Sequence, residues 1–126
     1  MGQARERAPR VPPAAQPLGV ARIVAVVSDL MLASRVTTSL AAAGHDVQQE
    51  TALPEEMGGV ELIVADLDAV SPEELAATGI PVVAFYQHTD TETQQRADAA
   101  GLEVVVPRSR MVRELPELAA GLLSRP

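Results

Sequence analysis

The sequence predicts a three-layer α/β domain built on a five-stranded parallel sheet. Short apolar runs alternate along the chain with segments that carry helix start and stop signals, which is the pattern of strand–helix–strand units. The run at 62–65, Leu-Ile-Val-Ala, is apolar at every position, as expected for a central strand that is covered on both faces. For five such strands, the order 2-1-3-4-5 is the common arrangement.

The composition fits one small domain with an aliphatic core. The 126 residues are 47% hydrophobic, but they include no Trp, one Phe and one Tyr. The absence of Cys and Lys excludes disulfides, thiolate zinc sites, cysteine nucleophiles and Schiff-base lysines. No apolar run approaches the ~18 residues of a membrane span, and the N-terminus lacks the apolar core of a signal peptide. These features predict a cytoplasmic protein that does not bind membranes.

The charge is acidic and unevenly distributed. The formal net charge is −7, although Arg5, Arg7 and Arg10 precede residue 20 against a single acid, Glu6. Binding of nucleic acid needs clustered cations and, for single strands, aromatic stacking surfaces. An acidic domain with so few aromatic residues is therefore not expected to bind nucleic acid.

Residues 1–19 differ in composition from the rest of the chain. They are rich in Pro, Ala and Arg and show no hydrophobic periodicity, so we predict a disordered tail. The folded domain is expected to span residues 20–126.

The first unit of the predicted domain is a strand at 22–27 followed by a helix at 30–43. Ser28 and Asp29 have short oxygen-bearing side chains that suit the N-cap of this helix. Gly44 then supplies a C-terminal cap. Together these segments make one half of a parallel crossover unit.

The next two helices are predicted to be short. A polar strand at 46–50, typical of a sheet edge, precedes the central strand. Only residues 51–60 connect the two strands, which leaves room for about one turn of a second helix. The third helix begins with Ser71 as cap and Pro72 at its first position, and it must end by Gly79.

The C-terminal part supplies two more strands, at 80–86 and 103–106, separated by a helix at 91–100. The last helix contains Pro116, which is expected to interrupt it. Its broad apolar stripe is formed by Met111, Val112, Leu115, Leu118, Leu122 and Leu123.

Residues 21–123 resemble the receiver domain of two-component response regulators. The closest matches are Leu-Ala-Ala-Ala-Gly-His-Asp-Val at 40–47, Leu-Ile-Val-Ala-Asp-Leu at 62–67 and Arg-Ala-Asp-Ala-Ala-Gly at 96–101. The resemblance implies a flavodoxin-like fold. In that family an aspartate on the third strand accepts a phosphoryl group, an acid pair after the first strand binds Mg²⁺, a Thr or Ser ends the fourth strand and a Lys ends the fifth.

By resemblance, the phospho-acceptor position falls on Asp66, but the metal-binding positions are altered. The acid pair is replaced by Val27 and Ser28, which leaves Asp29 as the only acid nearby. Mg²⁺ requires several oxygen ligands in near-octahedral geometry, and Val27 offers none. A weak oxygen site from Asp29, Asp66 and Asp68 is the remaining option for a metal.

The two switch positions of the family are altered as well. The hydroxyl position falls on Tyr86, whose ring is too large for the inward shift of a Thr, and the lysine position falls on Arg108. Arg is permanently charged and can form two parallel hydrogen bonds to a carboxylate. We therefore expect Arg108 to pair with Asp66 and to hold it without phosphate.

The leading hypothesis is a stand-alone, degenerate receiver that binds another protein without phosphorylation and is not an enzyme. It would need no cofactor, since Mg²⁺ would matter only if phosphorylation were retained, and it could act as a monomer or a homodimer. One alternative is an active single-domain phospho-receiver that uses Asp66. The other is a small flavodoxin-like enzyme or nucleotide binder, which lacks support because no glycine-rich phosphate loop follows the first strand. By resemblance, the candidate interaction face contains Gln94, Arg110, Met111 and Arg113.

Overall fold

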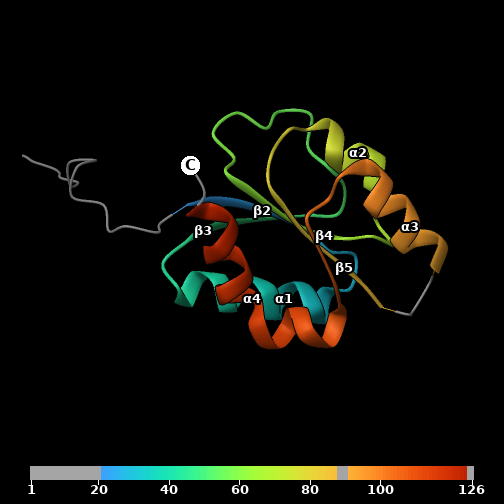
Figure 1. Cartoon of the computed structure of the whole chain (residues 1–126). Helices are drawn as coiled ribbons and strands as arrows, with labels where there is room; N and C mark the ends of the chain where they lie inside the picture. Colours follow the sequence, from blue (N-terminus) through green and yellow to red (C-terminus); the bar gives the residue numbers. More distant parts are fainter. Residues whose placement is uncertain (1–20, 88–90, 125–126) are drawn as a thin grey trace, which may run out of the picture.

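A computed structural model of the chain describes residues 21–87 and 91–124, which form a parallel sheet covered by helices on both faces (Figure 1). Its strands are β2 (Arg22–Val26), β3 (Asp46–Glu50), β4 (Leu62–Asp66), β5 (Val82–Tyr86) and β6 (Val104–Pro107). Its helices are α1 (Leu30–Ala42), α2 (Pro72–Ala77), α3 (Thr91–Ala100) and α4 (Arg108–Leu123). The predicted α/β class is confirmed, whereas the predicted tail at 1–19 lies outside the described residues.

The sheet has the strand order β3-β2-β4-β5-β6, which is the predicted 2-1-3-4-5 arrangement. All neighbouring strands are parallel; for example, Ile23 of β2 lies beside Leu62 of β4, and Ile63 lies beside Val82 of β5. Every residue of β4 is buried, because this strand is central in the sheet and is covered on both faces. The carboxyl end of β4 therefore lies in the middle of the sheet edge where open α/β folds place their ligands.

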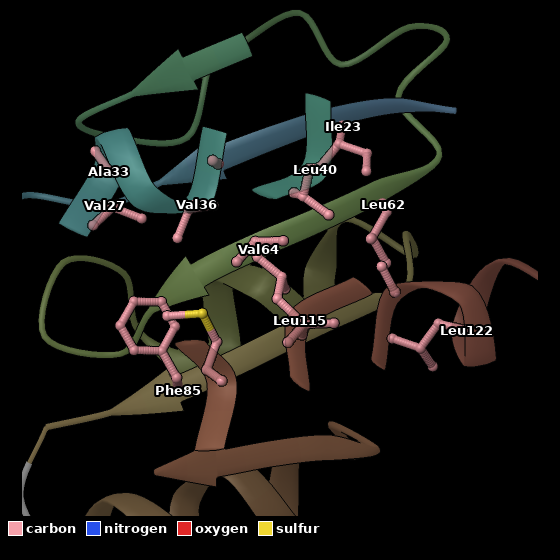
Figure 2. Close-up of a cluster of buried hydrophobic side chains, with 14 of the residues drawn as sticks. Ile23, Val27, Ala33, Val36, Leu40, Leu62, Val64, Phe85, Leu115 and Leu122 are labelled. Atoms are coloured by element: carbon pink, nitrogen blue, oxygen red, sulfur yellow. The ribbon is translucent and has the colours of Figure 1, made fainter. Parts of the chain in front are cut away.

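Two hydrophobic clusters lie on opposite faces of the sheet. On one face, α1 and α4 pack against alternate strand residues (Figures 1 and 2), and the buried members include Ile23, Val27, Val36, Leu40, Leu62, Val64, Phe85, Met111, Leu115 and Leu122. On the other face, α2 and α3 cover the cluster that includes Val24, Val26, Ile63, Ala65, Leu75, Val82, Ala84 and Ala97. Aliphatic side chains dominate both clusters, as the composition predicts.

Helix α1 forms as its pattern predicts. Leu32, Val36 and Leu40 recur every four residues and are all buried against the sheet. Asp29 is the N-cap, because its side chain accepts the free amide hydrogens of the first turn. Gly44 adopts a φ of 95° just after the helix, a conformation that glycine adopts without steric cost.

The connection between β3 and β4 contains no helix. The expected single turn at 51–60 is replaced by a loop, drawn in green in Figure 1. On the side of the sheet that such a helix would cover, β3 carries Asp46, Gln48 and Glu50, whereas Val47 points to the opposite face and packs against the α1–α4 cluster. A helix packed over these three polar side chains would separate them from water, which is energetically costly.

Two further expectations concern helix boundaries. The third predicted helix is α2, which is indeed brief at six residues and begins with a capping box between Ser71 and Glu74. In contrast, Pro116 does not interrupt the last helix, because α4 runs through it to Leu123. Within residues 21–87 and 91–124, no helix is both long and apolar enough to cross a membrane.

Candidate functional site

Asp66 is the last residue of β4 and the centre of the candidate site. Its side chain is only 5% exposed, which makes it the one buried charged residue in the described part of the chain. The Oδ1 atom accepts the amide hydrogen of Asp68 at 2.9 Å, and the backbone carbonyl accepts the amide hydrogens of Ala69 and Val70. Asp66 is therefore fixed by its own turn, at the position where the sequence places it.

The surroundings of Asp66 raise the pKa of its carboxyl. Burial raises the pKa of this carboxyl above its ordinary value, and the negative charges of Asp68 and Asp29 raise it further. The amide hydrogen of Asp68 and the positive charge of Arg108 lower the pKa but do not reverse the shift.

The turn after β2 brings Val27, Ser28 and Asp29 to the same edge of the sheet, but they do not make an acidic pocket. Val27 is fully buried and lies in the cluster with Ala33 and Val36 (Figure 2). Ser28 is exposed to solvent. Only Asp29 contributes a carboxylate from this turn.

Both oxygens of Asp29 already have partners. Oδ1 accepts the amide hydrogens of Met31 and Leu32 at 3.0 and 3.2 Å, which caps α1. Oδ2 lies 3.6 Å from Nη2 of Arg108, the first residue of α4. The expected ion pair between Arg108 and Asp66 is therefore wrong: Arg108 pairs with Asp29, because both lie at helix starts that meet above the sheet edge. Its influence on Asp66 is confined to long-range charge attraction.

The three acids at this edge of the sheet were the remaining option for a metal site. Within residues 21–87 and 91–124, no three His, Asp or Glu side chains are grouped to hold a metal ion, so Asp29, Asp66 and Asp68 do not form the oxygen site that the sequence left open. Instead, Asp29 caps α1 and pairs with Arg108, whereas Asp66 accepts the amide hydrogen of Asp68.

Tyr86 ends β5, as expected for the hydroxyl position of the resemblance. It lies beside Pro107 of β6 in the sheet register and is partly buried. The following residues 88–90 lie outside the described part of the chain. Tyr86, at the end of β5, and Arg108, directly after the end of β6, thus lie at the same edge of the sheet as Asp66.

The candidate interaction face on α3 and α4 is only partly available for contact. Arg110 and Arg113 are exposed, and both form ion pairs with Glu114 at 3.1 and 3.3 Å. Gln94 is partly buried. Met111 is fully buried in the core, so its inclusion in this face was wrong. Its neighbours at 110 and 113 project outward because they lie on the opposite side of the helix.

The structure also exposes an apolar pair that the sequence analysis did not single out. Leu30 and Met31, at the start of α1, are 72% and 80% exposed. The only available signal was that both fall outside the four-residue spacing of the buried face of α1. They lie beside the capped turn of Asp29.

Comparisons with known proteins identify the fold. No protein-family model matches the chain, and no curated protein sequence matches it. Solved structures do match: a response regulator receiver domain protein from Clostridium thermocellum is 12% identical with a TM-score of 0.72, covering 84% of this chain and 96% of that one.

Two further structures agree with this match. The non-phosphorylated HemR receiver domain from Leptospira biflexa is 17% identical with a TM-score of 0.70, covering 84% of this chain and 98% of that one. HP1043, an orphan response regulator of H. pylori, is 16% identical with a TM-score of 0.68, covering 85% of this chain and 99% of that one. The chain therefore has the receiver fold.

Proposed function

We propose that this chain is a receiver-like signalling module that acts by binding another protein, without phosphoryl transfer to Asp66. The observation that carries this proposal is the double engagement of Asp29, whose two oxygens cap α1 and pair with Arg108. Phosphoryl transfer depends on a cation that neutralises the charge developing on the transferred group. With Asp29 committed and Val27 apolar, the edge around Asp66 does not supply the ligands for such a cation.

The state of Asp66 supports the same proposal. Burial and the neighbouring charges of Asp68 and Asp29 raise the pKa of the Asp66 carboxyl above its ordinary value. In addition, one oxygen of Asp66 is engaged by the backbone of Asp68. Asp66 then contributes to the shape of the turn rather than to chemistry, and the module needs no enzyme activity or cofactor.

The proposed partner is a cytoplasmic protein, or a second copy of this chain, that contacts the exposed side of α3 and α4. Arg110 and Arg113 supply positive charge there, although Glu114 compensates part of it. Gln94 contributes an amide group at the border of the same face. Met111 has no part in this contact, because it is fully buried.

An active phospho-receiver is the alternative, and one observation favours it. Asp66 is retained at the carboxyl end of the central strand, the edge where the fold places ligands, with the exposed Asp68 two residues away. For this alternative to hold, Asp29 would have to leave Arg108 and turn toward Asp66. Such a rearrangement has a clear spectroscopic signature.

The test is amide NMR of the full chain, first with Mg²⁺ and then with beryllofluoride, which mimics a phosphoryl group on aspartate. We expect no site-specific shift in either titration, so that wild type and the Asp66→Asn variant respond alike when each is compared with its own spectrum before the additions. Saturable shifts centred on Asp66 that spread to Tyr86 and Arg108, and that disappear in Asp66→Asn, would establish the active receiver instead.

A further inference from the structure

Strand β3 forms one edge of the sheet, and half of its backbone groups have no partner strand within residues 21–87 and 91–124. The amide of Asp46 donates to the carbonyl of Ala21, and the carbonyl of Glu50 accepts the amide hydrogen of Val27, so these residues bond toward β2. Backbone groups alternate in direction along a strand. The amide and carbonyl groups of Val47 and Gln49 therefore point away from the sheet, where another strand could pair with them.

Among the described residues no helix covers the face of the sheet beside this edge, and the loop that follows β3 covers it only in part, through Leu53, Met57 and Val60. The loop at 51–61 leaves a hollow of about 360 Å³ over β2 and β3. Its lining combines polar and small apolar groups from the two strands and the loop, formed by Arg22, Ile23, Val24, Asp46, Gln48, Glu56, Gly58 and Val60. A partner strand on β3 would bring its side chains directly to the rim of this hollow.

The open face is predominantly acidic. Asp46, Gln48 and Glu50 share one face of β3, and the side-chain amide of Gln48 donates to the carboxylate of Glu50. Glu56 adds a third acid from the loop. The one cation of the lining, Arg22, is directed toward the loop, since a β-carbon at Gly59 would lie 3.0 Å from its Nη1 atom.

These charges decide which kind of strand fits. Two copies of β3 paired antiparallel about Gln48 would place Asp46 opposite Glu50 in both halves, and like charges directly opposite each other destabilise a sheet. A strand that carries cations at alternate positions would instead place them opposite Asp46 and Glu50, on the acidic face. Charge complementarity therefore disfavours a second copy and favours a basic extended segment.

We propose that the outer edge of β3 is a docking site for an extended, arginine-rich peptide segment of a partner protein, which adds to the sheet as a sixth strand. Main-chain hydrogen bonds to Val47 and Gln49 provide the affinity, and Asp46, Glu50 and Glu56 select alternating basic side chains. This inference goes beyond the proposed function, because it requires neither an inert Asp66 nor the surface of α3 and α4.

The test uses the full ¹⁵N-labelled chain and a short capped peptide in which Arg alternates with Thr. We expect saturable binding that slows hydrogen exchange at the amides of Val47 and Gln49 and leaves the amide of Asp66 unshifted. Neutralising the acids with the double variant Asp46→Asn/Glu50→Gln should weaken binding by about tenfold, the order expected for two exposed ion pairs.

A charge-matched control separates the site from the overall acidity of the protein. Asp98→Asn/Glu117→Gln removes two exposed acids from α3 and α4 and should leave the affinity unchanged. Gln49→Pro should abolish strand pairing, because proline lacks the outward amide hydrogen while the bonds toward β2 remain. A peptide with proline in place of Thr tests the same point without altering the protein.

Several results would overturn the proposal. One such result is equal binding of a peptide in which Glu alternates with Thr. Another is binding of the Arg–Thr peptide without slower hydrogen exchange at the amides of Val47 and Gln49. Slow exchange of these two amides in the free protein would also reject the proposal. If that protection grows with protein concentration, a second copy covers the edge; if it does not, the chain covers the edge itself.

Discussion

In the candidate site, the contacts of Asp29 and Asp66 determine where these two carboxylates lie. Asp29 and Asp66 both lie at the carboxyl edge of the sheet, yet Asp29 caps α1 and pairs with Arg108, while Asp66 is buried and held by the backbone of Asp68. The pair at 3.6 Å between Asp29 and Arg108 is partly exposed, so it is expected to contribute little stability by itself. Its importance lies in where it places the two side chains.

The raised pKa of Asp66 leads to a pH-dependent prediction for Asp66→Asn. Because the folded state binds this proton more tightly than the unfolded state, the ionised carboxylate destabilises the fold, and wild-type stability falls as the pH rises through the raised pKa. Asn cannot ionise and can still accept the Asp68 amide hydrogen. The variant should therefore melt at a higher temperature than wild type above that pKa.

Thermal unfolding across an acidic to neutral pH series provides the measurement. The advantage of Asn should shrink as the pH falls and vanish below the ordinary pKa of an aspartate, where both side chains are neutral. Asp98→Asn, on the exposed side of α3, controls for the loss of one acid from the chain. An advantage that is constant across the series would contradict the buried-carboxylate explanation.

Among the elements, α4 departs most from what its local sequence favours. Pro116 lies inside this helix of 16 residues, where its nitrogen cannot donate to the carbonyl of Val112. The helix continues because Met111, Leu115, Ala119 and Leu122 are buried against the sheet, and their burial offsets the missing bond. Pro72 has the opposite role, since the first position of α2 requires no amide donor.

Replacing these two prolines by alanine should have effects of opposite sign. Pro116→Ala restores a helix hydrogen bond and should raise the free energy of unfolding by about 1–2 kcal/mol, after allowance for the more flexible unfolded chain. Pro72→Ala should lower it by about 0.5–1 kcal/mol, since that proline already has a suitable φ. Urea denaturation of both variants measures the difference, and a Pro116→Ala variant no more stable than wild type would show that α4 accommodates proline without cost.

At the scale of the whole molecule, one sheet is shared by two separate hydrophobic clusters. Leu115 of α4 belongs to the cluster on the α1–α4 face, and Leu75 of α2 belongs to the cluster on the other face. Strand β4 contributes side chains to both clusters. If the helices on one face of the sheet detached, β4 would be exposed to water, and the cluster on the other face would lose support. The domain should therefore unfold as one cooperative unit.

Truncations in the two clusters test this cooperativity. Leu115→Ala and Leu75→Ala should each cost about 2–5 kcal/mol, because both side chains are fully buried. Each variant should still unfold in a single transition that far-UV circular dichroism and Tyr86 fluorescence report at the same denaturant concentration. Leu30→Ala makes the same chemical change at a 72% exposed position and should cost less than about 0.5 kcal/mol. Separate transitions in either core variant would mean that the two faces unfold independently.

Local sequence signals account for most of the fold. The apolar run at 62–65, the four-residue spacing of α1 and the Ser71–Glu74 capping box each depend on neighbours within a few residues, so they could be predicted from the sequence. The same signals placed Asp66 at the end of the central strand. The loop at 51–61 was harder to predict. The polar face of β3 argues against a covering helix, but this argument requires knowing that β3 lies at the edge of the sheet.

Sequence patterns were enough to predict the type and order of the elements, the parallel sheet and the position of Asp66, because hydrophobic period and capping chemistry act over short distances. These patterns could not predict that Arg108 pairs with Asp29, that Met111 is buried or that Leu30 and Met31 are exposed. These outcomes depend on how each helix is rotated and where its ends meet the sheet. That geometry is set by the packing of all the layers together, and no local pattern encodes it.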